Sequence, residues 1–183
     1  GVTSWCSITD REGKTPYLLL ERIYDPISFD HYIVNSTDPS VLLNFIMQIA
    51  LSLTLANQQF QFTHYDLHGG NILCWKLPDM KPHEHIVIPY PFMGRTLYLK
   101  TRRINSIIDL GGARVELDGQ RYHNAMPQFH CYDRFYGLSD IFRLLTHTYY
   151  LLTHYERFTL VPYLAKMISF FTDEDADKVI STC

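Results

Sequence analysis

Residues 64–71 read H-Y-D-L-H-G-G-N and run directly into an apolar stretch at 72–75. This segment places Asp66 and Asn71 five positions apart, on a loop ahead of an expected strand. Phosphoryl transfer needs a carboxylate near the attacking hydroxyl group and an amide oxygen near Mg²⁺. The spacing supplies both groups and therefore indicates a phosphoryl-transfer loop. A turn with incidental polar residues is the alternative for this segment taken alone.

A second acidic position lies downstream, where the apolar run at 106–108 ends in Asp109 and continues as D-L-G. A carboxylate at the end of a strand can supply a further oxygen ligand for Mg²⁺. An ordinary strand end is the alternative for this motif by itself. The two motifs occur in the order that a phosphoryl-transfer site requires, and together they favour such a site over two unrelated turns.

The overall composition indicates a folded globular protein. The chain has 183 residues, a length typical of one domain with a substantial core. It is 46% hydrophobic, 14% aromatic and 19% charged, which argues against extensive disorder. The formal charge of −3 gives no electrostatic reason to expect nucleic-acid binding. We therefore predict no nucleic-acid partner.

The spacing of the cysteines and the length of the apolar runs indicate the cellular compartment in which the protein is expected. Four cysteines are scattered along the chain without a C-x-x-C pair, which argues against a zinc knuckle and a disulfide framework. No stretch reaches the roughly eighteen uncharged apolar residues that a membrane span requires, and the N-terminus lacks a basic-then-apolar signal pattern. We predict an intracellular protein in a reducing compartment, the cytoplasm or nucleus, with a virion as the alternative, and without a membrane partner. His83 and His85 form H-x-H but lack completing ligands, so we expect solvated loop histidines.

Hydrophobic periodicity predicts an α+β fold. Asp38 as N-cap, Pro39 at the first helical position and an apolar stripe predict a long helix over 40–59. Residues 112–133 are polar and irregular, as expected of an exposed substrate-facing segment. The remaining expected elements are strands at 4–9, 16–23, 86–88 and 96–100, a break at 24–28, and helices at 29–34, 136–149 and 158–171.

With these residues in view, the chain resembles the C-terminal lobe of the protein-kinase superfamily, and most of all the haspin-type atypical Ser/Thr kinases. The resemblance rests on the helix leading into 64–73, the long insertion after it, I-I-D at 107–109 and Y-G-L-S-D-I-F-R-L at 136–144. As in haspin, His68 stands where most kinases carry Lys, and no A-P-E motif follows. Tyr65 in place of the usual Arg also resembles kinase-like proteins of large DNA viruses.

The resemblance implies a domain plan. Residues 1–23 correspond to the last strands of a kinase N-lobe and the start of the hinge. Residues 24–183 correspond to a mainly helical C-lobe with short β-hairpins, and a hairpin insertion at about 76–104 interrupts it.

The resemblance also implies roles for individual residues. Asp66 is the catalytic carboxylate, and His68 donates to a phosphate oxygen. Asn71 and Asp109 hold Mg²⁺ on the phosphates of ATP. The remaining assignments are the main chain of Glu21, Arg22 and Ile23 for adenine, and His64 and Asp140 for structural support of the loop.

Regulation by phosphorylation is not expected. Tyr65 cannot pair with a phosphate group as Arg would, so phosphorylation of the segment that begins at Gly112 should not activate the protein.

The implied function is that of a Ser/Thr protein kinase acting on a protein substrate with ATP and Mg²⁺. Residues 1–20 contain no glycine-rich loop and no strand Lys. We therefore expect a fragment that is inactive alone and lacks an N-lobe or a partner chain, although the full-length protein would be an enzyme. The alternatives are a small-molecule phosphotransferase of the aminoglycoside or choline kinase type and a non-catalytic interaction or virion protein with this fold.

Overall fold

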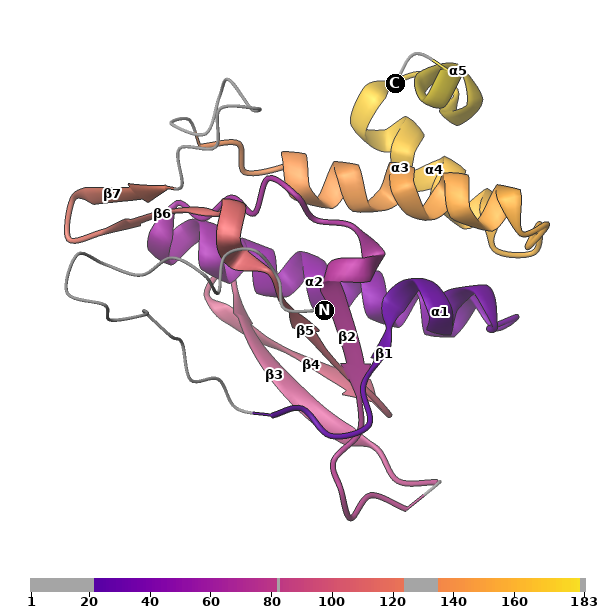
Figure 1. Cartoon of the computed structure of the whole chain (residues 1–183), viewed down its shortest axis with the longest axis horizontal. Coiled ribbons are helices and arrows are strands. Elements are labelled where there is room, and N and C mark those ends of the chain that lie inside the picture. The colour runs from indigo at the N-terminus through magenta and orange to yellow at the C-terminus, as the bar shows by residue number, and fades with distance from the viewer. Residues whose placement is uncertain (1–21, 82, 124–134, 182–183) are drawn as a thin grey trace, which may run out of the picture.

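The computed structural model describes residues 22–81, 83–123 and 135–181. The fold is α+β, as the sequence predicts (Figure 1). Glu21, the strand predicted over 4–9 and most of that over 16–23 lie outside the described residues, and Arg22 and Ile23 are in irregular structure rather than a strand. The elements are β1 (Ile27–Ser28), α1 (Phe29–Val34), α2 (Pro39–Phe60), η2 (Gly69–Asn71), β2 (Ile72–Trp75), β3 (Ile86–Phe92), β4 (Arg95–Thr101), β5 (Ile104–Ile107), η3 (Leu110–Gly112), β6 (Arg114–Leu117), β7 (Gln120–His123), α3 (Ser139–His154), α4 (Val161–Thr172) and α5 (Ala176–Ser181).

Helix α2 runs through the middle of the molecule and leads into residues 64–71 (Figure 1). Asp38 caps its N-terminus, accepting the Ser40 N–H at 2.8 Å, and Pro39 occupies the first turn. The predicted helix over 40–59 is thereby confirmed. Leu42 and Ile49 are fully buried and belong to the hydrophobic core. The helix ends at Gln61, which adopts a left-handed conformation with φ of 44°.

By length and composition alone, α2 could cross a membrane, because an 18-residue window has a mean hydropathy of 1.6. The sequence-based expectation that no run would qualify is therefore wrong, since Asn44 and Gln48 interrupt the apolar run without adding charge. In the structure Gln48 Nε2 donates to Thr101 Oγ1 at 3.1 Å and to the Arg103 carbonyl at 3.0 Å. These bonds join this face of α2 to the end of β4 and to the segment between β4 and β5. Core helices of soluble proteins pass the same test.

A three-stranded antiparallel sheet has the order β1-β2-β5, and its central strand β2 directly follows the predicted catalytic segment. Its register pairs Ile72 with Ile107. Beyond these strands the Ile108 N–H donates to the Asn71 carbonyl at 3.0 Å. The two stretches that carry the sequence motifs therefore lie side by side. Strand β1 forms where the sequence predicted a break at 24–28, because Ile27 and Ser28 pair with Cys74 and Leu73.

Two β-hairpins extend from this framework. The predicted strands at 86–88 and 96–100 are confirmed and lengthen into β3 and β4, joined by a tight turn at Met93 and Gly94. Strands β6 and β7 form a second hairpin, so the expectation of irregular structure over 112–133 is wrong for this part. Asp118 and Gly119 have φ of 51° and 75°, the left-handed pair of a two-residue hairpin turn. Residues 124–134 lie outside the described ranges.

The C-terminal helices close the other side of the core (Figure 1). Helix α3 begins three residues later and ends five residues later than the predicted 136–149, because the Ser139 N–H closes a turn onto the Tyr136 carbonyl before the helix starts. Helix α4 confirms the helix predicted over 158–171, starting three residues later and ending one residue later, and the short helix α5 was not predicted. Leu144, Leu152 and Leu164 are fully buried between α3 and α4.

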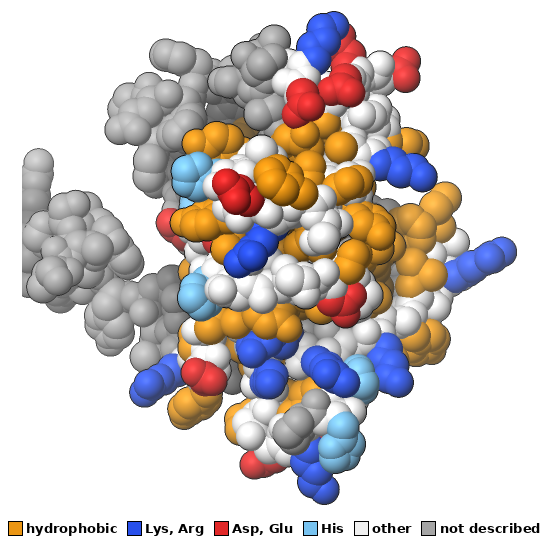
Figure 2. All heavy atoms as spheres, turned by 90° about the vertical axis from the view of Figure 1, so that its right-hand side faces the viewer, with side chains coloured by type: hydrophobic (Ala, Val, Ile, Leu, Met, Phe, Trp, Pro, Cys, Tyr) orange, Lys and Arg blue, Asp and Glu red, His pale blue; other side chains and the backbone are white. Residues whose placement is uncertain are grey.

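Figure 2 shows how charged side chains are distributed over the face that lies to the right in Figure 1. Several Asp and Glu side chains lie at one end of this view, with Lys or Arg among them, and more of the Lys and Arg lie toward the other end. Both signs occur at each end of this face, in keeping with the small net charge of −3.

Candidate functional site

The segment predicted to be catalytic, residues 62–71 (the catalytic segment), connects α2 to β2 and is held from one side by α3. Tyr65 has φ of 64°, an unfavourable conformation for a bulky residue. Both of its backbone groups are bonded to α3: its N–H donates to Asp140 Oδ1 at 3.0 Å, and its carbonyl accepts from Arg143 Nη1 at 2.5 Å. Helix α3 therefore stabilises the left-handed turn that immediately precedes Asp66.

Asp140 is the buried anchor of this segment. Its side chain is only 4% exposed, and besides the Tyr65 N–H it accepts the His64 N–H through Oδ2 at 2.7 Å. Burial raises the pKa of Asp140, while the two backbone N–H groups, His64 and Arg143 act in the opposite direction. Because an unpaired buried carboxylate is costly, these two bonds fix the position of the loop relative to α3.

Asp66 projects from the turn into a half-exposed position. Its Oδ1 lies 2.9 Å from Arg143 Nη2, and both side chains are 47% exposed. Arg143 thus binds the Tyr65 carbonyl with one guanidinium nitrogen and the Asp66 carboxylate with another. This forked contact orients the carboxylate while leaving it accessible to a reacting group.

His64 links Asp66 to the second motif. The His64 ring is fully buried, and its Nδ1 accepts the Asp66 N–H at 3.3 Å. A neutral ring that accepts at Nδ1 carries its proton on Nε2, and Nε2 lies 2.9 Å from the Ile108 carbonyl. His64 therefore bonds both to the residue predicted to be catalytic and to the residue just before Asp109.

Asn71 and Asp109 present oxygen atoms on neighbouring strand ends. Asn71 Nδ2 donates to the Asp66 carbonyl at 3.0 Å, which leaves the amide oxygen available as a ligand. Asp109 is exposed, has φ of 59° and makes no side-chain capping bond to the turn that follows. An amide oxygen and a carboxylate are the hard ligands that Mg²⁺ prefers. The two residues fit the predicted metal role.

The structure gives less support for the roles predicted for the other site residues. His68 caps η2, with Nδ1 accepting the Gly70 N–H at 3.1 Å. Arg22 is exposed, and its guanidinium lies 5.5 Å from the Tyr24 ring centroid. Glu21 lies outside the described residues, so the structure brings together the catalytic and metal candidates but not the predicted adenine-binding stretch.

Sequence reasoning did not assign roles to three residues that the structure places beside this segment, namely Arg143, His147 and Asp30. Arg143 and His147 follow Asp140 at spacings of three and seven, which puts all three on one face of a helix. That periodicity was an available signal. Asp30, on α1, carried no comparable signal because its neighbours come from distant parts of the chain.

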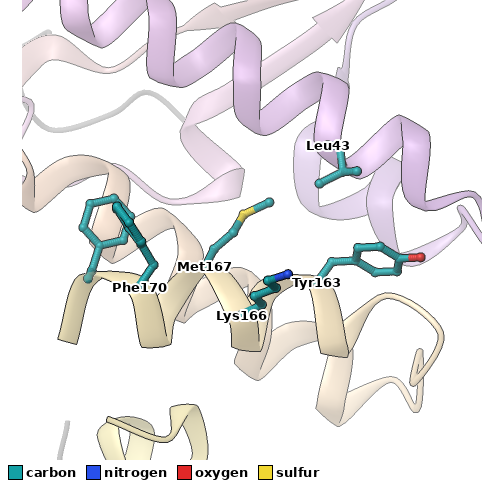
Figure 3. Close-up of a pocket in the computed structure, with 6 residues that line it drawn as sticks. Leu43, Tyr163, Lys166, Met167 and Phe170 are labelled. Atoms are coloured by element: carbon teal, nitrogen blue, oxygen red, sulfur yellow. The ribbon is translucent and has the colours of Figure 1, made fainter. Parts of the chain in front are cut away.

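An apolar groove lies between α2 and α4, away from these residues. Figure 3 shows Leu43 of α2 facing Met167 of α4, with Tyr163, Lys166 and Phe170 beside it. None of its lining residues is a predicted site residue. The groove is therefore a surface feature separate from the catalytic segment.

Comparison with known proteins gives one partial similarity. No family model matches the chain. A serine/threonine-protein kinase haspin homolog from Drosophila melanogaster is 32% identical over 83 residues, which are 45% of this chain. The matched part spans 14% of that relative's length. The similarity supports a kinase-like relationship and agrees in that coarse form with the resemblance read from the sequence.

Proposed function

We propose that the chain is the catalytic lobe of a Ser/Thr-type protein kinase, which transfers the γ-phosphoryl group of ATP to a protein hydroxyl. One observation carries the proposal: a chain of hydrogen bonds joins the two motifs. The Asp66 carbonyl accepts from Asn71, and the Asn71 carbonyl accepts from Ile108, the residue before Asp109. A carboxylate and two oxygen ligands held at fixed relative positions are the protein's main contribution to phosphoryl transfer.

In this proposal Asp66 orients the attacking hydroxyl group and accepts its proton. The contact with Arg143 Nη2 holds the carboxylate by one oxygen. The carboxylate must present its other oxygen to the hydroxyl group, which must approach within about 2.6–3.2 Å for proton transfer. Arg143 is therefore a positioning residue rather than a catalytic one.

Asn71 and Asp109 would hold Mg²⁺, which when bound neutralises negative charge on the nucleotide phosphates. His68 would add a donor, because a neutral ring whose Nδ1 accepts from Gly70 carries its proton on Nε2. A neutral imidazole is a weaker partner for phosphate than Lys. The chain's own groups therefore position the phosphates more than they offset their charge.

A protein acceptor is preferred over a small molecule because the similar protein from Drosophila melanogaster is named a serine/threonine-protein kinase. Residues 1–20 carry no glycine-rich sequence that could cover the phosphates. We propose that a further segment or a partner chain completes the ATP site. The 183 residues alone should transfer little or no phosphate.

The test is phosphoryl transfer from radiolabelled ATP, measured for the 183-residue chain and for the full reading frame that contains it. In the active form Asp66→Asn should lower the rate by about 10²–10⁴-fold while leaving nucleotide affinity nearly unchanged. Asp109→Ala should instead weaken Mg-ATP binding, measured by calorimetry. Asp79→Ala is the matched control, because Asp79 is exposed on the loop after β2. Undiminished transfer by Asp66→Asn would refute the assignment.

A further inference from the structure

Three potential metal ligands converge beside the catalytic segment. Asp30 of α1, His68 of the catalytic segment and His147 of α3 each offer one ligand atom, and these atoms lie within 4.8 Å of one another. The three residues are far apart in sequence, and all are partly buried. Their convergence is therefore a product of the tertiary fold.

Asp30 has an unusual environment for a carboxylate. Its Oδ2 lies 3.2 Å from His147 Nε2, whereas Oδ1 is buried and has no hydrogen-bond partner. A buried carboxylate oxygen without a partner is destabilising, and an ion held by the same carboxylate would offset part of this cost. The unpaired oxygen is an observation independent of the clustering itself.

Gly69 provides the space that this carboxylate occupies. A Cβ atom at Gly69 would lie 1.8 Å from Asp30 Oδ1 and 2.7 Å from its Cγ. Any larger residue at this position would displace the carboxylate. The backbone of the catalytic segment therefore holds Asp30 against the two histidines.

The geometry is close to that of a zinc site. Ligand atoms about 2.0–2.1 Å from a tetrahedral Zn²⁺ lie about 3.3 Å from one another. The contact between Asp30 and His147 already has a length of 3.2 Å. A separation near the 4.8 Å limit within which all three ligand atoms lie would have to shorten by about 1.5 Å. Rotation of the imidazole rings, whose centroids are 5.5 Å apart, would have to supply this change.

Binding has a small local cost at His68. If the metal binds Nδ1, it replaces the 3.1 Å hydrogen bond from the Gly70 N–H. If it binds Nε2, the ring proton moves to Nδ1, the same hydrogen bond is lost, and Nε2 can no longer donate to a phosphate oxygen. In either case one long hydrogen bond at a half-buried turn is exchanged for a metal–imidazole bond.

We propose that Asp30, His68 and His147 bind a divalent transition-metal ion of the Zn²⁺ type. Two imidazoles and one carboxylate suit Zn²⁺, whereas Mg²⁺ prefers an all-oxygen set such as Asn71 and Asp109. Three ligands in a partly exposed position leave a further coordination position for water. The ion would join α1 and α3 to the catalytic segment. This proposal does not depend on the chain being a kinase.

The test is metal binding by the 183-residue chain after its thiols have been alkylated. Alkylation removes accessible cysteines as competitors, and burial raises the pKa of Cys74 to about 12, so its thiol stays protonated. Equilibrium dialysis with Zn²⁺ should show one ion per chain, and Co²⁺ should give a visible spectrum without thiolate charge transfer. Mg²⁺ in equal concentration should not displace the bound ion.

Variants locate the site. Asp30→Asn and His147→Gln should each lower Zn²⁺ affinity by more than roughly tenfold, since even outer-shell changes cost about that much. His154→Gln, exposed on the same helix, and His85→Gln in the H-x-H segment are matched controls that should bind normally. Circular dichroism without metal checks that each variant is folded. Absence of Zn²⁺ uptake, or loss of uptake only in His85→Gln, would overturn the proposal.

A second measurement needs no variant. Zn²⁺ should protect His68 and His147 from modification by diethyl pyrocarbonate, while His85 and His154 stay reactive, as read by mass spectrometry of peptides. Equal modification of all four histidines with and without Zn²⁺ would indicate a hydrogen-bonded cluster around Asp30 that binds no metal.

Discussion

Replacing Asp140 tests whether α3 holds the catalytic segment in place. The carboxylate accepts two backbone N–H groups, from His64 at 2.7 Å and from Tyr65 at 3.0 Å. Asp140→Ala removes both acceptors and leaves two N–H groups unpaired at a buried position. Asp140→Asn keeps one oxygen acceptor and replaces the other with an amino group that faces a donor.

The expected magnitude follows from these contacts. A hydrogen bond to a charged group contributes about 1.5–3 kcal/mol, so two bonds give about 3–6 kcal/mol. The carboxylate is costly to bury, as its raised pKa shows, and this cost disappears in the variant. We therefore expect Asp140→Ala to lower the free energy of unfolding by about 3 kcal/mol. Asp140→Asn should lower it by about half as much.

Urea unfolding of the 183-residue chain and its variants gives these values. The comparison requires that the slope of the free energy of unfolding against urea concentration is the same for all of them. Asp79→Ala, at an exposed position, should stay within about 0.5 kcal/mol of the parent. A loss below about 1 kcal/mol for Asp140→Ala would show that the segment holds its shape without α3.

Two further predictions concern packing and pH. Gly69→Ala should lower the free energy of unfolding by about 1–3 kcal/mol because its Cβ would overlap Asp30, whereas Gly112→Ala, with its nearest neighbour at 3.8 Å, should change it little by the same urea assay. Tyr149→Phe removes the 2.5 Å hydrogen bond to Asp177 Oδ1 and should cost roughly 1–2 kcal/mol at neutral pH. This bond, with burial, raises the pKa of Tyr149 from 10.0 to about 12. The stabilisation is complete below pH 10 and is lost as the pH rises through about 12, so the difference between parent and Tyr149→Phe in urea unfolding should shrink over that interval. A difference that does not change with pH would contradict the assigned hydrogen bond.

Local signals in the sequence predicted the local structure. The N-cap Asp38 and the stripe of apolar residues predicted α2 almost to its ends, because both signals act within one helix. The start of α3 was predicted too early, since the apolar spacing continues into a turn that only the backbone bond from Ser139 to Tyr136 reveals. The β6–β7 hairpin was missed although Asp118-Gly119 is a strong turn signal, because few apolar residues flank it.

Only those parts of the candidate site that lie within short stretches of sequence could be predicted. Residues 64–71 and Asp109 carry recognisable spacing, and pairing of β2 with β5 then brings them together. Asp30 could not be predicted, because its neighbours are defined by the packing of α1 against the catalytic segment and α3. The position of Arg143 against Asp66 also depends on the rotation of α3 about its axis, which a single sequence does not specify.

The rotation of α3 about its axis determines three contacts of the site together. Asp140, Arg143 and His147 lie on one face of α3 and contact, in order, the backbone around Tyr65, the Asp66 carboxylate and the Asp30 carboxylate. Successive residues turn by about 100° around a helix, so a rotation by one residue would break all three contacts at once. A metal ion bound at His147 would resist such a rotation. Since Arg143 lies one turn away, the ion would also hold the Asp66 carboxylate in its orientation without touching it.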